Sequence, residues 1–233
     1  MKTVVQIVNS LRGGNRAQRH RKFISFLEEL NTEYKEVPLH SEIRWLSAGK
    51  CLRNFFSLRK EIVLFFETEI VINTDVFITK LKNKTFFREL AFLTDITSHL
   101  NTLNLQLQGK NKTVSQLVSQ IEIFRKKLDL FENCMKINDL NNFPACLEIN
   151  QEETMVDFSR FAKVLTEIQR EFDERFSEFD APSRADQFGC MTVRFQQPGF
   201  ATQNLLSWDV CSVVSQPSTP TSDFNTDEFV NNF

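Results

Sequence analysis

The sequence predicts an all-α fold, a multi-helix domain followed by a disordered C-terminal tail, and three observations support this prediction. Apolar residues recur every three or four positions along most of the first 180 residues, which is the spacing of a buried helix face. The hydrophobic content of 41% in 233 residues is enough for a substantial core. The aromatic residues comprise 24 Phe but only one Tyr and two Trp, and rings without a polar group favour burial between helices.

Three helices are expected in the first 66 residues. Apolar positions in residues 4–11 predict a short helix that ends at Gly13-Gly14, because paired glycines stop a helix. Residues 16–30 form a second periodic segment with basic residues in its first turns. Ser47 is a predicted N-cap, since a serine hydroxyl can accept a bond from the free backbone N–H groups of a first turn. The third helix would then run to about residue 66.

Two longer helices are expected in the middle of the chain. Residues 85–107 carry two adjoining apolar stripes, which predict a helix that is buried on two sides. Thr113 and Gln116 have the spacing of a capping box, so a further helix should begin there and continue to Phe131. A loop is expected around Pro144.

The last predicted helix carries a stripe of Phe, Leu and Ile side chains at steps of three or four residues, from Phe158 to Phe179. Burying such side chains contributes roughly 1.5–3 kcal/mol each before conformational entropy is counted. The stripe must therefore pack within the chain or on a partner. Phe161, Phe172 and Phe176 are the candidate protein-interaction residues.

Beyond Pro182 the composition shifts to Gln, Ser, Thr, Pro and Asn, with few basic residues. This is the composition of a disordered acidic tail. The domain boundary is placed near residue 181, giving a helical domain over 1–181 and a tail over 182–233. No internal repeat is evident.

The sequence excludes several classes of function. It has no GxGxxG, GxxxxGK[ST], HExxH or GxSxG motif, and its five Cys and three His do not have zinc-site spacing. We therefore expect no enzyme activity, catalytic residue, metal, cofactor or small-molecule substrate. No run of eighteen apolar residues predicts a membrane span, and the N-terminus lacks a signal-peptide pattern, so an intracellular protein is expected.

Charge is distributed unevenly along the chain. Residues 1–60 hold 12 Lys and Arg against 5 Glu, while the remaining residues hold 16 against 25 Asp and Glu. This pattern fits an anionic partner at the N-terminal end, and it fits intramolecular complementarity equally well. The basic residues cluster at Arg12, Arg16, Arg19, His20, Arg21 and Lys22. Arg12, Arg16 and Arg19 share one helix face if Gly13-Gly14 does not break the helical register, and such a face could bind phosphates. The alternative is a solvated helix face.

The segment HSEIRWLSAGK, residues 40–50, is a second candidate site, because Trp is scarce in this chain. Arg44 could contact phosphate and Trp45 could stack on a base, with Lys50 nearby on the following helix. The alternative is that Trp45 forms a hydrophobic staple ahead of the Ser47 cap, which would give it a packing role only.

Three blocks of the sequence resemble the hAT superfamily of transposases and its domesticated descendants. The blocks are EYKEVPLHSEIRWLSAGKCLRNFFSLRKEIVLFF (33–66), ELAFLTDITSHLNTLNLQLQGKNKTVSQLVSQIEIFRKKLDLFE (89–132) and FSRFAKVLTEIQREFDERFSEF (158–179). They are similar to the transposase-derived regions of BED-type and SCAN-domain zinc-finger proteins and of general transcription factor II-I repeat domain-containing protein 2. The blocks keep the family's order over roughly residues 1–180.

In that superfamily a long helical insertion interrupts an RNase H-like catalytic fold. The resemblance implies that this chain corresponds to the insertion, because the catalytic acidic residues, the dimerisation segment and the zinc finger find no counterpart in the sequence. It also implies that Trp45 lies near DNA and stacks on an extruded base.

The resemblance implies a catalytically inactive, domesticated transposase domain that binds nucleic acid or chromatin-associated proteins in the nucleus. The alternative is a helical protein-interaction or dimerisation module that does not bind nucleic acid. The alternative location is the cytoplasm. The expected partners are DNA, nuclear proteins or a second copy of the chain, and no membrane.

Overall fold

The computed structural model confirms the all-α fold for the part of the chain that it describes. Described are residues 2–12, 16–34, 36–37, 45–68, 75–108, 112–153 and 156–177, and no strand occurs among them. The predicted boundary near residue 181 and the predicted tail over 182–233 lie outside these residues and remain predictions.

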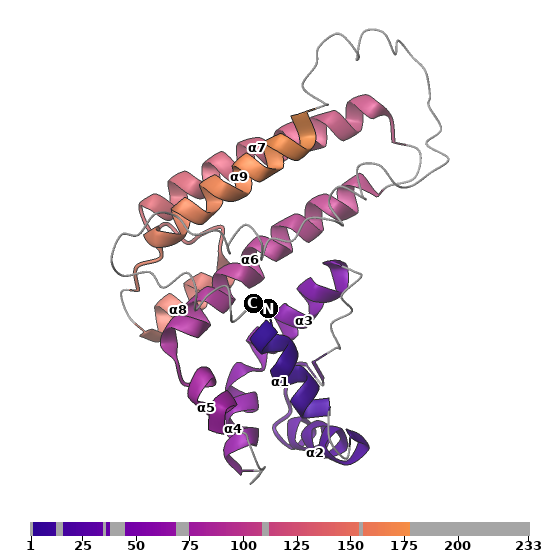
Figure 1. Cartoon of the computed structure of the whole chain (residues 1–233), viewed down its shortest axis with the longest axis vertical. Helices are drawn as coiled ribbons and strands as arrows, with labels where there is room; N and C mark the ends of the chain where they lie inside the picture. The colour runs from indigo at the N-terminus through magenta and orange to yellow at the C-terminus, as the bar shows by residue number, and fades with distance from the viewer. Residues whose placement is uncertain are drawn as a thin grey trace. The chain divides into compact units, whose positions relative to one another are not determined.

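The described residues form nine α-helices and one 3-10 turn. In order they are α1 (Lys2–Arg12), α2 (Arg16–Glu29), α3 (Trp45–Ser57), α4 (Arg59–Thr68), α5 (Asp75–Leu81), α6 (Lys84–Leu107), α7 (Val114–Lys136), α8 (Pro144–Glu153), η1 (Ser159–Phe161) and α9 (Ala162–Phe176) (Figure 1).

The chain divides into two compact units. The described residues of 2–97 and 143–153 form unit 1, and those of 98–142 and 156–177 form unit 2. Helix α6 begins in unit 1 and ends in unit 2, and α8 returns the chain to unit 1. As predicted, α6 is apolar on two sides, and every residue from Leu90 to Thr97 is buried.

Phenylalanine rings dominate the core of unit 1. Phe65 packs edge-on against Phe23 of α2, with ring centroids 5.0 Å apart, and also contacts Phe66. Phe92 of α6 stacks on Phe143, which immediately precedes α8. One set of rings joins α2 to α4, and the other joins α6 to the residue before α8, so these Phe side chains serve contacts between helices, as expected.

Helix α8 corrects the prediction of a loop around Pro144. Pro144 is the first residue of α8, a position where its missing N–H would have had no intrahelical partner anyway. The next two N–H groups, of Ala145 and Cys146, donate to the two carboxylate oxygens of Asp95 on α6, both at 3.0 Å. Asp95 therefore caps α8 from fifty residues away in sequence, which local sequence patterns could not indicate.

The third predicted helix is two helices. Leu58 forms a turn between them, so α3 ends at Ser57 and α4 begins at Arg59. The predicted N-cap is also wrong, because α3 starts at Trp45 and Ser47 lies inside its first turn. A serine in the first turn is compatible with a helix, because the backbone N–H groups of that turn have no intrahelical hydrogen bond that a hydroxyl could disrupt. Only the backbone of Trp45 is described, so its predicted packing role stays a prediction.

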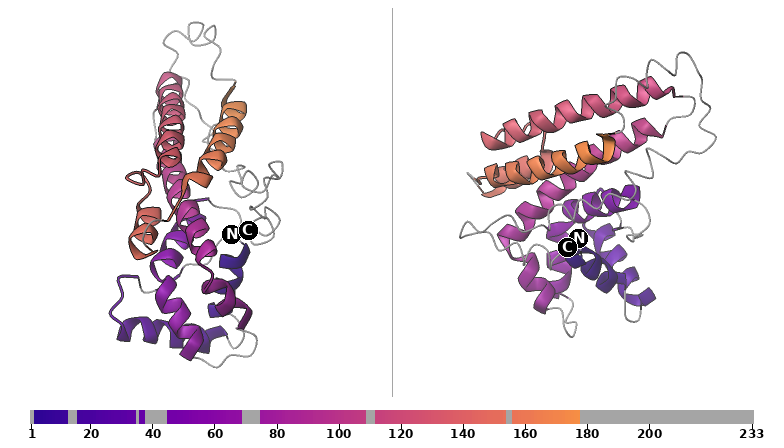
Figure 2. Two further views of the ribbon diagram at one scale, coloured as in Figure 1. Left: turned by 90° about the vertical axis from the view of Figure 1, so that its left-hand side faces the viewer. Right: turned by 45° about the horizontal axis from the view of Figure 1, so that its top comes forward.

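In unit 2, α7 and α9 lie side by side and antiparallel (Figure 2). Three polar contacts fix the register: Glu132 with Thr166, Asp129 with Gln169, and Arg125 with Asp173. The predicted capping box at the start of α7 is confirmed, with Thr113 and Gln116 each bonded to the other's backbone N–H.

Candidate nucleic-acid interface

Arg12, the first residue of the predicted basic cluster, is used inside unit 1. Its guanidinium donates to the carbonyl of Val37 at 2.9 Å and pairs with the carboxylate of Glu36 at 3.3 Å. The carbonyl of Glu36 in turn accepts a bond from Asn54 of α3. Arg12 thereby ties α1 to the segment after α2, and this segment is tied to α3. Its surroundings give it a structural role.

The thiol of Cys51 lies in the same environment. Burial raises its pKa to about 11, and the positive charge of Arg12 offsets part of that rise. The positive charge of Arg12 therefore acts on a buried group of unit 1.

Arg19 also makes an internal contact. It donates to the backbone carbonyl of Ser10 on α1 at 2.8 Å, which joins α1 to α2. A buried carbonyl near the C-terminal end of α1 gains a charged donor in this way, and positive charge is favourable at a helix C-terminus. The α1–α2 hairpin therefore uses two of its predicted site residues for its own assembly.

Arg21 and Lys22 on α2, and Lys50 on α3, have exposed side chains. Arg21 and Lys22 belong to the predicted basic cluster and Lys50 to the second candidate site, and all three are part of unit 1. We define them as the exposed cations. Arg53 has the same exposure one turn beyond Lys50 and was missed by the sequence analysis, although the spacing of three residues on one helix could have indicated it.

The remaining predicted residues have no described side chain. Arg16 lies in the first turn of α2 and Trp45 begins α3, but only their backbones are described. Arg44 lies outside the described residues. The prediction that Arg44 and Trp45 contact nucleic acid is therefore untested.

The three candidate protein-interaction residues, Phe161, Phe172 and Phe176, are buried within unit 2. Phe172 contacts Phe124 of α7 with ring centroids 5.2 Å apart, and it also packs on Phe176. The described structure thus gives these side chains a place in the seam between α7 and α9. Their predicted role in dimerisation is not tested by it.

Asp95 and Cys146 are buried titratable groups of unit 1 that lie in contact with each other at the start of α8. Burial raises the pKa of Asp95 to about 6, against the opposing effect of its two backbone hydrogen bonds at α8. Burial also raises the pKa of the Cys146 thiol well above its usual value, helped by the adjacent charge of Asp95. In the described part of the chain, no group of three His, Cys, Asp or Glu side chains could hold a metal ion.

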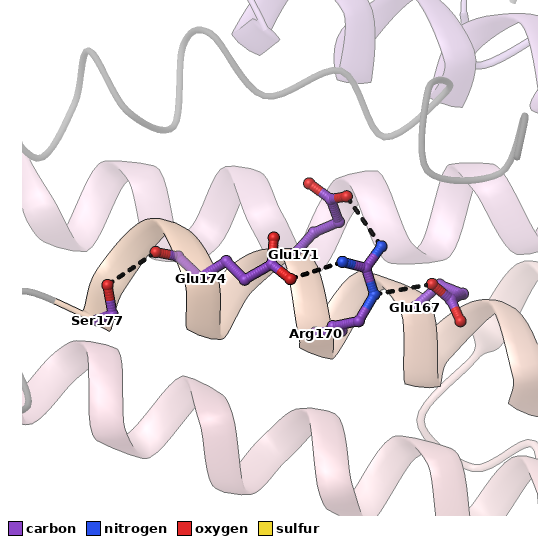
Figure 3. Close-up of polar contacts among 5 residues, drawn as sticks. All are labelled: Glu167, Arg170, Glu171, Glu174 and Ser177. Carbon is purple, nitrogen blue, oxygen red and sulfur yellow. Dashed lines mark hydrogen bonds and ion pairs between the residues drawn. The ribbon is translucent and has the colours of Figure 1, made fainter.

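The exposed face of α9 carries a charge cluster, which Figure 3 shows. Arg170 pairs with Glu167 at 3.1 Å, with Glu171 at 3.1 Å and with Glu174 at 2.6 Å. The hydrogen bond that Arg170 donates to Glu167 makes the largest contribution to raising the pKa of Arg170. One guanidinium among three carboxylates leaves this face acidic, so it is unsuited to phosphate. None of the described helices has the length and apolar character needed to cross a membrane.

Comparison with known proteins identifies relatives of most of the chain. The family model of the FAM200/GTF2IRD2 helical domain matches residues 1–136. General transcription factor II-I repeat domain-containing protein 2 of Bos taurus is 34% identical over 179 residues, which is 77% of this chain and 18% of that protein. Its counterpart in Mus musculus is 32% identical over 179 residues, with the same shares. No solved structure matches the chain.

The chain spans less than a fifth of the length of these two relatives. The similarity to general transcription factor II-I repeat domain-containing protein 2 that the sequence blocks indicated is confirmed by these matches. Since the family model covers more than half of the 233 residues, the chain belongs to the family of FAM200/GTF2IRD2-like helical domains.

Proposed function

We propose that this chain is a non-catalytic helical domain, derived from a hAT transposase, that binds nucleic acid in the nucleus through the exposed cations of unit 1. The observation that supports this most directly is that some of the predicted basic residues are exposed, whereas others are bonded within unit 1. Arg12 and Arg19 are bonded to neighbouring backbone carbonyls, while the side chains of Arg21, Lys22 and Lys50 are exposed. Exposed basic side chains can be approached by phosphate groups from solvent.

Two further features support the proposal. The carboxyl group with a strongly raised pKa, Asp95, is held by the N-terminus of α8, so it is not presented to a substrate. The two relatives carry a transcription factor's name, which is the reason for proposing a nuclear location. A hAT origin rests on the resemblance of the three sequence blocks.

The test is binding of the purified chain to duplex, hairpin and single-stranded DNA at two salt concentrations. The triple variant Arg21→Ala/Lys22→Ala/Lys50→Ala should bind more weakly and with a shallower salt dependence. Each lost phosphate contact lowers the slope of log affinity against log salt by about 1. Melting should be unchanged, because the three side chains are exposed.

A matched control removes the same charge from exposed lysines of unit 2, in Lys126→Ala/Lys127→Ala/Lys163→Ala. If both triple variants lose affinity equally, binding follows net charge alone and the proposed interface is wrong. If the wild-type chain binds no form of DNA at low salt, the alternative of a protein-interaction module is favoured.

A further inference from the structure

Helix α7 exposes three large apolar side chains at intervals of seven residues. Ile123 is 47% exposed, Leu130 is 51% exposed and Ile137, the residue that follows the helix, is 78% exposed. Seven residues make almost two full helical turns, so these side chains follow one line along the helix. We call this line the α7 stripe.

The α7 stripe is distinct from the seam with α9. Phe124, Leu128 and Phe131 are buried, and Phe124 contacts α9 directly. On a helix with 3.6 residues per turn these positions lie roughly 80–140° around the axis from Ile123. The α7–α9 pairing therefore leaves the stripe exposed, and apolar side chains that are aligned along one side of a helix can serve as anchor points for a bound segment.

Positive charge lies beside the stripe. Lys126 and Lys127 are both exposed, between Ile123 and Leu130 in sequence. On the helix surface they flank the line on its two sides, at roughly 40–60° from it. A segment that fits this surface has several apolar side chains and an acidic residue among them.

The described part of the chain ends on the same unit as the α7 stripe. The backbone carbonyl of Phe176, near the end of α9, accepts a bond from Arg125 of α7 at 3.2 Å. Arg125 is two residues from Ile123 in sequence, which places it roughly 160° around the helix axis from the stripe. A segment that follows Ser177 therefore reaches the stripe only if the chain between them is long enough to pass around α7.

One segment of the following sequence has the required composition. Residues 205–214, LLSWDVCSVV, contain seven apolar residues and a single charge, Asp209. The chain from residue 178 to the end holds seven acidic residues against two basic ones, which complements the lysine pair. The intervening residues 178–204 can extend up to roughly 90 Å, whereas the stripe is about 21 Å long. The tether also supplies an effective concentration that is on the order of millimolar.

We propose that residues 205–214 dock in cis on the α7 stripe, with Trp208 among the residues that contact it and Asp209 beside Lys126 and Lys127. The docked segment covers the exposed Ile and Leu side chains within a single chain. This proposal concerns unit 2 and is independent of the nucleic-acid interface proposed for unit 1.

The test uses Trp208 as a reporter in the full chain, with Trp45→Phe removing the other tryptophan. Docking predicts blue-shifted emission and slow quenching by acrylamide, in both cases independent of protein concentration over a 50-fold range. Leu130→Lys should raise the quenching constant at least threefold. Leu105→Lys is the matched control, since Leu105 is 59% exposed on α6 of the same unit and lies off the stripe.

A charge exchange tests the same contact without altering the apolar line. Lys126→Glu/Lys127→Glu should increase quenching of Trp208, and adding Asp209→Lys should restore protection. The proposal is overturned if Trp208 is quenched as fast as in a free peptide of residues 200–216. It is also overturned if Leu130→Lys and Leu105→Lys have the same effect, or if protection is lost on dilution, which indicates a contact between two copies.

Discussion

The two units stabilise their helices by different means. In unit 1, the short helix α8 is held by polar contacts from residues that are far apart in sequence. Asp95 caps α8 from fifty residues away, and Arg59 at the start of α4 reaches Glu148 and Glu152 on α8 at 2.7 and 2.6 Å. In unit 2, the long helix α7 begins at a local cap at Thr113 and joins α9 through an apolar seam, with the polar contacts that fix its register around that seam. A long helix with a regular apolar face can thus be held mainly by that face, whereas α8 depends on a cap and ion pairs from distant residues.

The largest expected effect is loss of the unit 2 seam. Phe172→Ala removes a ring that is fully buried between α7 and α9 and leaves a cavity, so the free energy of unfolding should fall by about 3–5 kcal/mol. Chemical denaturation followed by circular dichroism measures the change. Leu105→Ala, at an exposed position of the same unit, should change it by less than about 0.5 kcal/mol. Equal losses in the two variants would mean that the seam is not the source of stability.

The next effect is loss of the long-range ion pairs in unit 1. Arg59 is only 4% exposed, stacks on Phe56 and pairs with two glutamates that are partly solvated. Arg59→Ala should therefore cost about 2–3 kcal/mol, less than a fully buried pair would, because water can stabilise the two carboxylates that remain. The control is Lys60→Ala, which removes an exposed partner of Glu152 and should cost less than about 1 kcal/mol. If both variants lose the same free energy of unfolding, the buried position of Arg59 gives its ion pairs no advantage over a surface pair.

The cap of α8 should make unit 1 sensitive to pH. Burial raises the pKa of Asp95 to about 6 from a model-compound value of 3.8, so the folded state binds this proton more tightly than the unfolded chain. The contribution of this group to stability is therefore greatest at low pH and is lost as pH rises through about 6. Between pH 7.5 and pH 5, the stability of the wild-type chain relative to Asp95→Asn should increase by about 1 kcal/mol.

His99 in unit 2 acts in the opposite direction. Burial against Phe131 lowers its pKa, so its contribution to stability is lost as pH falls below the usual histidine range. The difference between wild-type and Asp95→Asn cancels this contribution, because both chains contain His99. A pH-independent difference between them would show that Asp95 has the same pKa in the folded and unfolded states.

The smallest effect belongs to the local cap of unit 2. Thr113→Ala removes one half of the capping box and should cost about 0.5–1 kcal/mol, since water can replace part of the bond at this exposed site. Thr102→Ala, at an exposed position inside α6, should be neutral or slightly stabilising because alanine is the better helix former. Thermal melting of both variants gives the comparison, and a neutral Thr113→Ala would show that the cap is dispensable.

The same contrast explains what the sequence could predict. The helices of unit 2 and α6 were predicted because their apolar residues recur at a regular interval and the cap at Thr113 is local. Helix α8 was not predicted, because its first N–H groups are capped by Asp95 and its glutamates pair with Arg59. Neither partner can be identified from residues 144–153 alone. The basic cluster was correctly noted as unusual, but the division between Arg12, which is bonded to Val37, and the exposed Lys50 required the fold.

The return of the chain to unit 1 at α8 has a consequence for its synthesis. Residues up to 97 leave the ribosome first, yet unit 1 cannot form the Arg59 pairs or cap α8 until residues 143–153 have emerged. At 5–20 residues per second, an order-of-magnitude translation rate, that interval lasts a few seconds. The N-terminal helices of unit 1 therefore remain incompletely packed while α7 is synthesised. A nascent chain halted between residues 98 and 142 would expose the site that α8 later occupies.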